Sequence, residues 1–425
     1  MTTGCYLGID VGTGSVRAGL FDETGHMLGL GSEPIRLHSP AEDFVEQSSD
    51  DIWRACGVAV RAALGAAGIG PEAVAGIGFD ATCSLVALDG ADQPVSVSPT
   101  GLDAQNVIVW MDHRATRQAE RINATGHEVL RFVGGSVSPE MQTPKLLWLL
   151  ENLPDTWRRA RRFLDLPDFL SFRATGVDTR SLCTTTCKWT YRARDGRWDD
   201  LFFRQIGLQQ LVDERYERIG TRVRPVGDRA GELTAASAAQ LGLRPGIPVA
   251  SSLIDAHAGG LGVLGFREAG APLSADVLEQ RVALIGGTST CHMAVSREPR
   301  FVPGVWGPYY AAMVPELWLS EGGQSATGAL IDHTIDSHVR GPALRDQART
   351  RGTTIYALLN AHVEKMAADA PVPAFLTRGL HVLPDHHGNR SPRADPHMRG
   401  MICGLRLTDS IDALALLYVA TVQAL

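Results

Sequence analysis

The first residues with clear chemical potential are Asp10 and the glycine-rich turn that follows it in YLGIDVGTGSVRAGLFD. The stretch reads as a strand, a turn and a second strand. Backbone, hydroxyl and guanidinium donors that can hold phosphate oxygens come from Thr13, Gly14, Ser15 and Arg17. Because Mg²⁺ typically binds one or two carboxylates together with phosphate oxygens, Asp10 beside this turn indicates a magnesium–nucleotide site.

Two common nucleotide-binding motifs do not account for this turn. A dinucleotide fingerprint needs a third glycine where Arg17 stands and a helix after the turn, whereas a strand follows here. The chain contains no GxxxxGK[ST] sequence. A tight hairpin that needs glycine for positive φ is the structural alternative, and Asp10 together with Arg17 favours the phosphate site.

A second strand–glycine–strand segment, RVALIGGTSTCHMAVS at 281–296, is similar to the first. Its residues Gly287, Thr288 and Ser289 take the places of residues 12–14. This weak internal repeat indicates two similar lobes that offer phosphate hairpins to a shared cleft, a common place for a ligand.

A further candidate is Asp255, in the stretch SLIDAHAGG. It follows an apolar strand, and Gly259 and Gly260 come after it in an expected glycine-rich loop that leaves room for a ligand. A carboxylate at this place can also be a helix cap, which is the structural alternative.

The elements that must position these residues read as α/β. The opening hairpin continues into a third strand at 26–30, which predicts an antiparallel meander. Cap residues at 48–51 and Gly68 bound an expected helix. Two buried strands and a second helix are expected at 73–79, at 106–110 and between Pro144 and Pro154.

The composition of the 425 residues, 44% hydrophobic and 20% charged, is that of a globular protein with two or three domains. A net charge of −7 offers no basic face for a nucleic acid. No apolar run approaches the roughly 20 residues that a membrane span needs. Seven scattered cysteines indicate reduced thiols in the cytosol. We therefore expect a cytoplasmic protein with neither nucleic-acid nor membrane partners.

Two sets of potential metal ligands do not form a convincing site. Cys183 and Cys187 are not spaced as CxxC, and no second pair completes a zinc site. His386, His387 and His397 have no further partners in the sequence and are interpreted as loop histidines.

Several motifs, in this order, make the sequence resemble the FGGY carbohydrate kinases of the actin/hexokinase/Hsp70 ATPase superfamily. They are GIDVGTGSVRAGLFD, FVEQSSDDIW, GIGFDATCSLVALD, WMDHRA, PKLLWLLEN, SLIDAHAGG, LIGGTSTCHMAVS and EGGQSATG. The likeness is strongest to the D-ribulokinase branch, through TCSLV at 82–86. The resemblance implies a two-lobed α/β fold of ribonuclease-H-like architecture, with domains at 1–264 and 265–425.

The resemblance also implies roles for individual residues. Asp255 would take the proton from the attacking sugar hydroxyl, and Asp10 would help to position Mg²⁺. The phosphates of ATP would contact Thr13, Gly14, Ser15 and Arg17 of the first hairpin and Gly287, Thr288 and Ser289 of the second. The implied sugar contacts, at expected strand ends or in loops, are Thr82, Cys83, Trp110, Asp112, Arg114, Lys188, Asp255 and Glu321, with Trp110 facing a carbon surface.

The expected activity is phosphorylation of a ketopentose by MgATP, with D-ribulose converted to D-ribulose 5-phosphate. L-ribulokinase and ribitol kinase are the alternatives within the family. Two other classes are a non-catalytic sugar-binding remnant and an ATPase without a sugar substrate. Intact Asp10, Asp255 and Glu321 argue against the remnant, and the sugar-pocket motifs argue against the plain ATPase.

The last segment, TDSIDALALLYVATVQAL, predicts a helix with Asp409 and Ser410 as cap candidates. It ends at Leu425 without the usual glycine, proline or polar residues. The resemblance implies a further stretch with the adenosine-binding motif. We therefore expect an incomplete second lobe, weak ATP binding, and an exposed apolar face that favours aggregation or homodimer formation.

Overall fold

A computed structural model describes residues 4–267, 273–368, 370–393, 395 and 397–425. The chain divides into two compact units. Unit 1 comprises Met1–Val282 and Ala294–Ser320, and unit 2 comprises Ala283–Met293 and Glu321–Leu425. Helices and strands alternate through unit 1, which agrees with the α/β class expected from the sequence.

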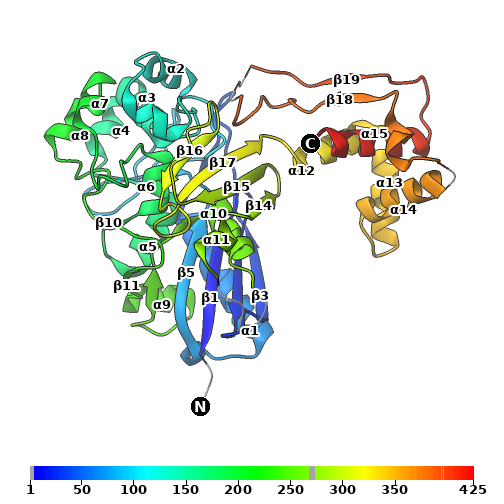
Figure 1. Ribbon diagram of the computed structural model, residues 1–425. Helices are drawn as coiled ribbons and strands as arrows, with labels where there is room; N and C mark the ends of the chain where they lie inside the picture. Colours follow the sequence, from blue (N-terminus) through cyan, green and yellow to red (C-terminus); the bar gives the residue numbers. More distant parts are fainter. Residues whose placement is uncertain (1–3, 268–272, 369, 394, 396) are drawn as a thin grey trace. The chain divides into compact units, whose positions relative to one another are not determined.

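A seven-stranded sheet is the framework of unit 1. Its strands are β1 (Cys5–Val11), β2 (Ser15–Phe21), β3 (Met27–Pro34), β5 (Val74–Ala81), β11 (Arg229–Glu232), β12 (Pro248–Ala250) and β13 (Leu253–Ile254). The order is β11-β12-β5-β1-β2-β3, and β13 pairs with β5. β1 is parallel to β5, whereas β1, β2 and β3 form the predicted antiparallel meander (Figure 1).

Alternation along β1 separates a core face from a polar face. Leu7, Ile9 and Val11 are fully buried, and Asp10 points to the opposite side of the sheet. The register places Asp10 directly opposite Arg17 on β2 and Asp80 on β5. Directly paired residues share one face of a sheet, so these three side chains gather on the polar face.

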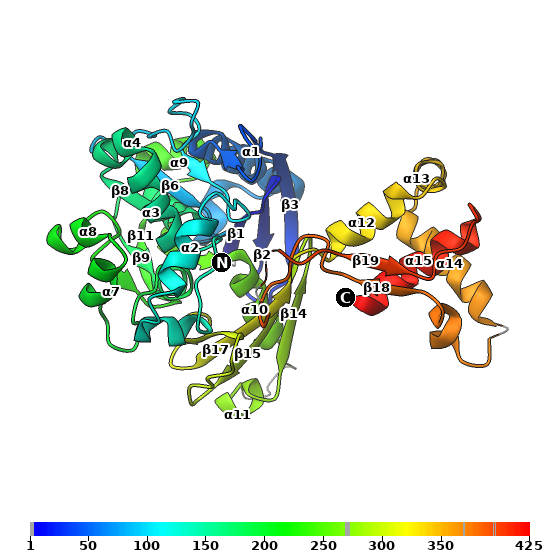
Figure 2. The ribbon, with the colours of Figure 1, turned by 90° about the horizontal axis from the view of Figure 1, so that it is seen from above.

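Helix α1 (Ser49–Ala67) packs against β2 and β3 of the meander (Figure 2). Its predicted bounds are confirmed by two caps. Ser48 accepts a hydrogen bond from the Asp51 amide at the start, and Gly68 adopts a left-handed φ of 64° at the end.

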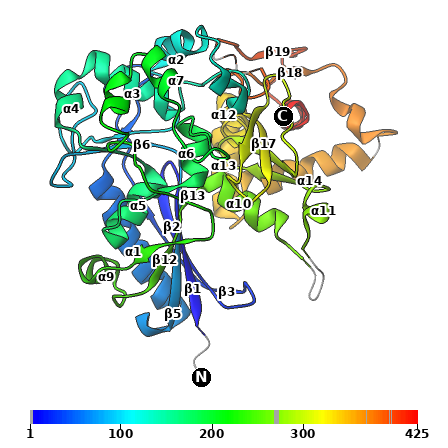
Figure 3. The same cartoon turned by 60° about the vertical axis from the view of Figure 1, so that its left-hand side comes forward.

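The core of unit 1 joins this sheet to helices from distant parts of the chain. Buried residues of β1, β2 and β5 cluster with residues of α1, α5 (Leu166–Thr175) and α9 (Ala235–Leu241). Figure 3 shows α5 and α9 beside β5 and β12. The other helices of unit 1 are α2 (Thr116–Asn123), α3 (Gln142–Asn152), α4 (Pro154–Arg159), α6 (Leu182–Lys188), α7 (Asp200–Gln205), α8 (Gln209–Asp213), α10 (Asp255–Leu264), α11 (Ala275–Leu278), η1 (Pro71–Ala73) and η2 (Glu128–Val133).

Unit 1 also contains two smaller sheets. An antiparallel sheet of order β4-β7-β6-β8 contains β4 (Glu46–Gln47), β7 (Val107–Ile108), β6 (Leu85–Leu88) and β8 (Arg162–Asp165). β9 (Arg180–Ser181) pairs in parallel with β10 (Val223–Arg224). The strand expected at 106–110 is therefore present but shorter than predicted.

A four-stranded sheet of order β14-β15-β17-β16 is divided by the unit boundary, which falls inside β14, β15 and β17. Its strands are β14 (Val282–Gly286), β15 (Thr290–Ser296), β16 (Trp306–Tyr310) and β17 (Trp318–Gln324). β14, the turn and β15 confirm the strand–glycine–strand segment predicted at 281–296.

The rest of unit 2 is mainly helical. Its elements are α12 (Gly328–Ser337), α13 (Gly341–Thr350), α14 (Ile355–Ala368), α15 (Ile411–Ala424), η3 (Pro373–Thr377) and the antiparallel pair β18 (His381–Leu383) and β19 (Met401–Cys403). α15 starts at the predicted cap Ser410 and packs on α12 and α14. Leu414 and Ala415 of α15 are fully buried in a cluster with Ile335 and Leu359. The apolar sequence of this helix therefore reflects core packing.

The segment after Asp255 differs from its prediction. A glycine-rich loop was expected there, but the chain enters helix α10 at Asp255, directly after β13. Glycine lowers helix propensity by only about 1 kcal/mol per residue, and tertiary packing commonly overrides a cost of that size. The buried His257, Gly260 and Leu264 supply this packing.

No helix in the described part of the chain combines the length and the apolar character that a membrane crossing requires.

The contact of β3 with α1 yields a stability prediction. A Cβ added at Gly31 would lie 2.1 Å from the Ala59 carbonyl oxygen, on the backbone of α1. Since backbone cannot move aside cheaply, we expect Gly31→Ala to lower the free energy of unfolding by about 1–3 kcal/mol in urea denaturation. Gly65→Ala is the matched control, because Gly65 lies in α1 with open space around its added Cβ. That change should be neutral or stabilising by up to about 1 kcal/mol. Equal effects of the two changes would show that the approach of β3 to α1 does not require glycine at position 31.

Candidate functional site

Three carboxylates gather at the ends of adjacent strands in unit 1. Asp10 lies near the end of β1, and Asp80 is its partner in the register on β5. Asp255 follows β13 directly, and β13 pairs with β5 through Leu253 opposite Asp80. Parallel strands thus bring together residues that are far apart in the sequence, at the sheet edge where α/β proteins commonly bind ligands.

Asp10 lies between Arg17 and Asp80. Its Oδ2 lies 2.6 Å from Arg17 Nη2 in an ion pair. Its Oδ1 is buried, and the Asp80 carboxyl is a neighbouring side-chain partner. Burial raises the pKa of Asp10, and the Arg17 charge offsets only part of this effect.

Asp80 was not predicted as a site residue. Burial raises the pKa of Asp80 well above its usual range, and the neighbouring Asp10 and Asp255 charges raise it further. A signal for this residue exists in the sequence, because Gly8-Ile9-Asp10 and Gly78-Phe79-Asp80 end two predicted strands in the same way. Their pairing in the sheet could not be read from that similarity alone.

Asp255 occupies the first position of α10. Its Oδ1 accepts a 2.7 Å hydrogen bond from the Ala256 backbone amide. Ile254 is the N-cap of this helix, and no side chain forms a capping hydrogen bond at its start. The alternative that Asp255 serves as a helix cap is therefore not supported.

Two backbone hydrogen bonds fix the first glycine-rich turn as a closed hairpin. The Gly12 amide donates to the Ser15 carbonyl at 3.0 Å, and the Ile35 amide donates to the Gly14 carbonyl at 3.1 Å. Side chains also reach Thr13: Gln47 Nε2 donates to its carbonyl at 2.8 Å, and Trp110 Nε1 donates to its Oγ1 at 3.0 Å.

The second hairpin, in unit 2, is closed by a shorter backbone bond. The Gly287 amide donates to the Ser289 carbonyl at 2.8 Å, two residues on, whereas the Gly12 amide donates to a carbonyl three residues on. The Thr288 carbonyl accepts from the Thr327 amide at 2.8 Å, at the beginning of α12. Both segments are strand–turn–strand, and the bonds within their turns differ.

The turn after β5, which contains Thr82 and Cys83, is fixed from several sides. The Thr82 amide donates to the Val11 carbonyl at 3.0 Å, which ties this turn to the end of β1. Gln142 Nε2 donates to the Cys83 carbonyl at 3.0 Å and to Asp165 Oδ2 at 2.9 Å. Burial raises the pKa of the Cys83 thiol to about 11 and that of Asp165 to about 7.

Gln142 and Asp165 are buried residues that were not predicted to belong to the site. Asp165 also accepts a hydrogen bond from Trp189 Nε1 at 2.9 Å. Lys145, likewise not predicted, is fully buried and donates through Nζ to the Val109 carbonyl at 3.0 Å. Isolated polar residues in apolar segments, such as Gln142 and Lys145 in α3 and Asp165 at the end of β8, give no sequence signal for such contacts.

Lys188 and Glu321 are both buried, in unit 1 and unit 2 respectively. Lys188 ends α6, and its Nζ lies 5.4 Å from the centroid of the Trp306 ring. Glu321 lies on β17, and its carbonyl accepts a 2.9 Å hydrogen bond from Ser391 Oγ.

The predicted sugar contacts of Asp112 and Arg114 are not supported by the structure. The side chains of both residues are completely buried, and Arg114 Nε donates to Asp112 Oδ1 at 2.8 Å. Arg114 Nη2 also donates to Glu46 Oε1 at 2.8 Å, and the guanidinium lies 4.0 Å from the centroid of the Phe44 ring. Because these groups satisfy one another in the core, we interpret them as a structural network.

The described residues contain no group of three or more histidine, cysteine or acidic side chains arranged to hold a metal ion by themselves. A magnesium ion in proteins typically needs only one or two carboxylates when phosphate oxygens supply the other ligands. The buried Oδ1 of Asp10, beside a second desolvated carboxyl at Asp80, fits such a shared ion.

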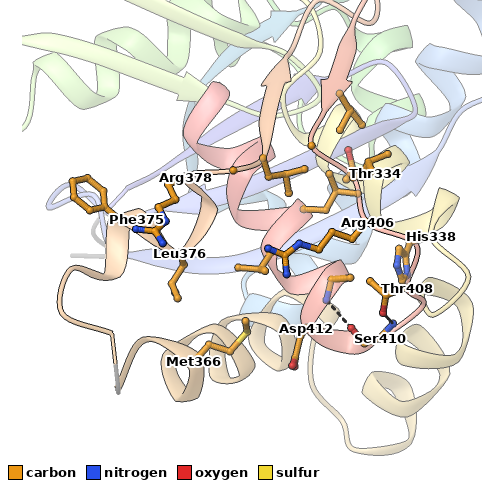
Figure 4. A pocket seen from close by; sticks show the side chains of 18 of the residues that line it. Thr334, His338, Met366, Phe375, Leu376, Arg378, Arg406, Thr408, Ser410 and Asp412 are labelled. Carbon is orange, nitrogen blue, oxygen red and sulfur yellow. Dashed lines mark hydrogen bonds between the residues drawn. The ribbon is translucent and has the colours of Figure 1, made fainter.

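A cavity of about 1350 Å³ in unit 2 contains none of the predicted site residues. It is lined by parts of α12, α14, η3 and α15 and by the segment 404–408 (Figure 4). Cavity size alone therefore does not mark the chemistry-bearing part of this chain.

Comparisons with known proteins agree with the family resemblance. Residues 5–262 match the N-terminal domain of the FGGY family of carbohydrate kinases, and residues 282–425 match its C-terminal domain. A human FGGY carbohydrate kinase domain-containing protein is 53% identical over 424 residues, which cover 99% of this chain and 76% of that protein.

A Saccharomyces cerevisiae protein named D-ribulokinase is 39% identical, over 98% of this chain and 62% of its own length. Among solved structures, xylulose kinase from Rhodospirillum rubrum is similar in fold. Its TM-score is 0.71 at 21% identity, with 98% of this chain and 76% of that chain covered.

These matches correct one expectation and establish the family. The match to the C-terminal domain extends over residues 282–425, so the expected incompleteness of the second lobe is not borne out. Leu414 and Ala415 of α15 are buried in a helical core, while Ile411 and Val422 of the same helix are exposed. With both family domains matched along its length, the chain belongs to the FGGY family of carbohydrate kinases, which transfer a phosphoryl group to a sugar.

Proposed function

We propose that this kinase phosphorylates D-ribulose with MgATP and releases D-ribulose 5-phosphate and ADP. The observation that carries the phosphoryl-transfer chemistry is the gathering of Asp10, Asp80 and Asp255 at adjacent strand ends. The choice of sugar is supported by the yeast relative named D-ribulokinase, which is 39% identical. We place the domain boundary after residue 264, between the two matched spans.

In the proposed reaction, Asp255 accepts the proton of the terminal primary hydroxyl of the sugar. The hydroxyl oxygen forms a bond to the γ-phosphorus, while the bond from that phosphorus to the bridging oxygen breaks and ADP leaves. Asp255 must be ionised to act as the base, and the Ala256 amide donates a hydrogen bond to its carboxylate.

The proposed nucleotide contacts come from the two hairpins. In unit 1, Thr13, Gly14, Ser15 and Arg17 surround the phosphates, and in unit 2 the contacts are Gly287, Thr288 and Ser289. Asp10 would hold the magnesium ion with the phosphate oxygens. The ion would neutralise charge on the phosphates.

The proposed sugar contacts are the turn residues Thr82 and Cys83, the ring of Trp110, and the charged groups of Lys188 and Glu321. Hydroxyl, ammonium and carboxylate groups match the hydroxyl groups of a pentulose. The structural network of Asp112 and Arg114 is left out of this set, because its groups are satisfied within the core.

A substrate panel tests the choice of sugar. We expect kcat/KM for D-ribulose to exceed the values for L-ribulose, D-xylulose and ribitol, because a site that hydrogen-bonds a hydroxyl rejects analogues that misplace it. The measurement is sugar-dependent ADP release at saturating MgATP. A higher kcat/KM for L-ribulose or ribitol would show that this sugar, and not D-ribulose, is the preferred substrate. ADP release without sugar would indicate a plain ATPase.

Asp255→Asn tests the base. The amide keeps the size of the side chain and can still accept the hydrogen bond from the Ala256 amide, but it cannot take a proton. We expect an unchanged melting temperature, retained sugar binding by calorimetry, and a loss of at least about 100-fold in kcat. Retention of more than half of the activity would show that the proton goes elsewhere.

Asp10→Ala tests the magnesium role. We expect the magnesium concentration needed for half-maximal activity to rise clearly, with a smaller change in the KM for sugar. Asp22→Ala is the matched control, since Asp22 is an aspartate in the turn between β2 and β3 and hydrogen-bonds only its own turn. If Asp10→Ala changed only the KM for sugar, Asp10 would belong to the sugar site and the proposed magnesium role would be wrong.

A further inference from the structure

Trp110 connects the first phosphate hairpin to the turn that follows β5. It follows β7 in unit 1, and its two N–H groups point to different segments of that unit. The backbone amide donates to Ser84 Oγ at 3.2 Å, and the indole Nε1 donates to Thr13 Oγ1 at 3.0 Å. Trp110 thus donates one hydrogen bond to the Ser84 hydroxyl and one to the Thr13 hydroxyl.

The bond from the indole restricts what the Thr13 hydroxyl can do. An indole N–H is only a donor, so Thr13 Oγ1 must be the acceptor of this bond. The hydroxyl has one proton of its own, which remains available for another acceptor. Ionised phosphate oxygens are acceptors, so a hydroxyl oriented in this way is a ready donor to a phosphate.

Thr13 is also held through its backbone, by the bond from Gln47 Nε2 to its carbonyl. Gln47 is almost completely buried on β4, so this anchor belongs to the folded core. With the carbonyl and the side-chain oxygen both fixed, little rotational freedom is left for Thr13 to lose when a ligand binds.

The same residue acts on the turn after β5. Ser84 Oγ accepts from the Trp110 amide and lies 3.1 Å from Thr82 Oγ1. Because the Ser84 oxygen already accepts one bond, its own proton is available to Thr82. The two N–H groups of Trp110 therefore link the Thr82–Ser84 pair to Thr13.

We propose that Trp110 is a positioning residue whose indole N–H orients the Thr13 hydroxyl as a hydrogen-bond donor to the nucleotide phosphates. This inference rests on the proposed function, in which the first hairpin holds those phosphates. The indole nitrogen of Trp110 then has a role separate from the proposed contact of its ring with the sugar.

Trp110→Phe tests the proposal, because it keeps an aromatic ring and the backbone amide and removes the indole N–H. The affinity for a non-hydrolysable MgATP analogue is measured by calorimetry without sugar, so the readout does not depend on which sugar is the substrate. We expect roughly five- to tenfold weaker nucleotide binding, the size of one lost hydrogen bond.

A double-mutant cycle with Thr13→Val separates this role from a general loss of stability. Without the hydroxyl, Trp110→Phe should cause no further loss of nucleotide affinity, since the two residues act as one unit. Thr13→Ser keeps the hydroxyl and should restore most of the affinity. Trp53→Phe is the matched control, because it removes an indole hydrogen bond to Gln240 that lies in the α1–α9 contact. It should leave nucleotide binding unchanged.

Three outcomes would overturn the proposal. They are additive effects of Trp110→Phe and Thr13→Val, unchanged nucleotide affinity in Trp110→Phe, and an equal loss in Trp53→Phe. A wild-type protein that binds the analogue but turns over no pentulose would contradict the proposed sugar while leaving this inference standing. A wild-type protein that binds no nucleotide would overturn both.

Discussion

The in-register pairing of β1, β5 and β13 is the constraint on which the site depends. It places Asp10 opposite Asp80 and brings the start of α10, with Asp255, beside the end of β5. Carboxylates that are this close and partly desolvated repel one another, which raises the pKa of Asp80 in particular. Arg17 relieves one side of the cluster. The remaining negative charge suits a site for a divalent cation shared with phosphates, which agrees with the membership in a kinase family.

Burial and hydrogen bonding distinguish the charged pair Asp112 and Arg114 from the proposed magnesium ligand Asp10. Asp112 and Arg114 stand at a strand end, as a binding pair would, yet Glu46 and Phe44 complete their contacts in the core. Removing one partner of such a buried network leaves an uncompensated charge, which is strongly destabilising. Asp10, by contrast, is partly exposed and lies beside Asp80, a second carboxyl of like charge. A ligand could therefore bind at Asp10, whereas the buried groups of Asp112 and Arg114 already bond one another.

The first glycine-rich hairpin, which we propose holds the phosphates, is fixed by several hydrogen bonds. Backbone bonds close it, Gln47 fixes the Thr13 carbonyl, and Trp110 fixes the Thr13 hydroxyl. A hairpin that is rigid before the nucleotide arrives loses less conformational freedom on binding, so more of the contact energy appears as affinity. Gln47 and Trp110 come from motifs that carry the family resemblance and the predicted sugar contact, and the structure connects both to the first hairpin.

The sequence by itself determined the elements whose signals are local. Alternating residues and turn glycines predicted the meander of β1, β2 and β3, cap residues predicted α1 with correct bounds, and the motif order predicted the family. The tertiary structure alone decided that Asp80 joins Asp10, that Asp112 and Arg114 are core residues, and that α10 and α15 are packed helices. These outcomes depend on strand pairing and burial between residues far apart in the sequence. Long-range strand pairing and burial leave no periodic pattern in the sequence. The partners that desolvate a charge, or that stabilise a glycine-containing helix, come from other segments of the fold.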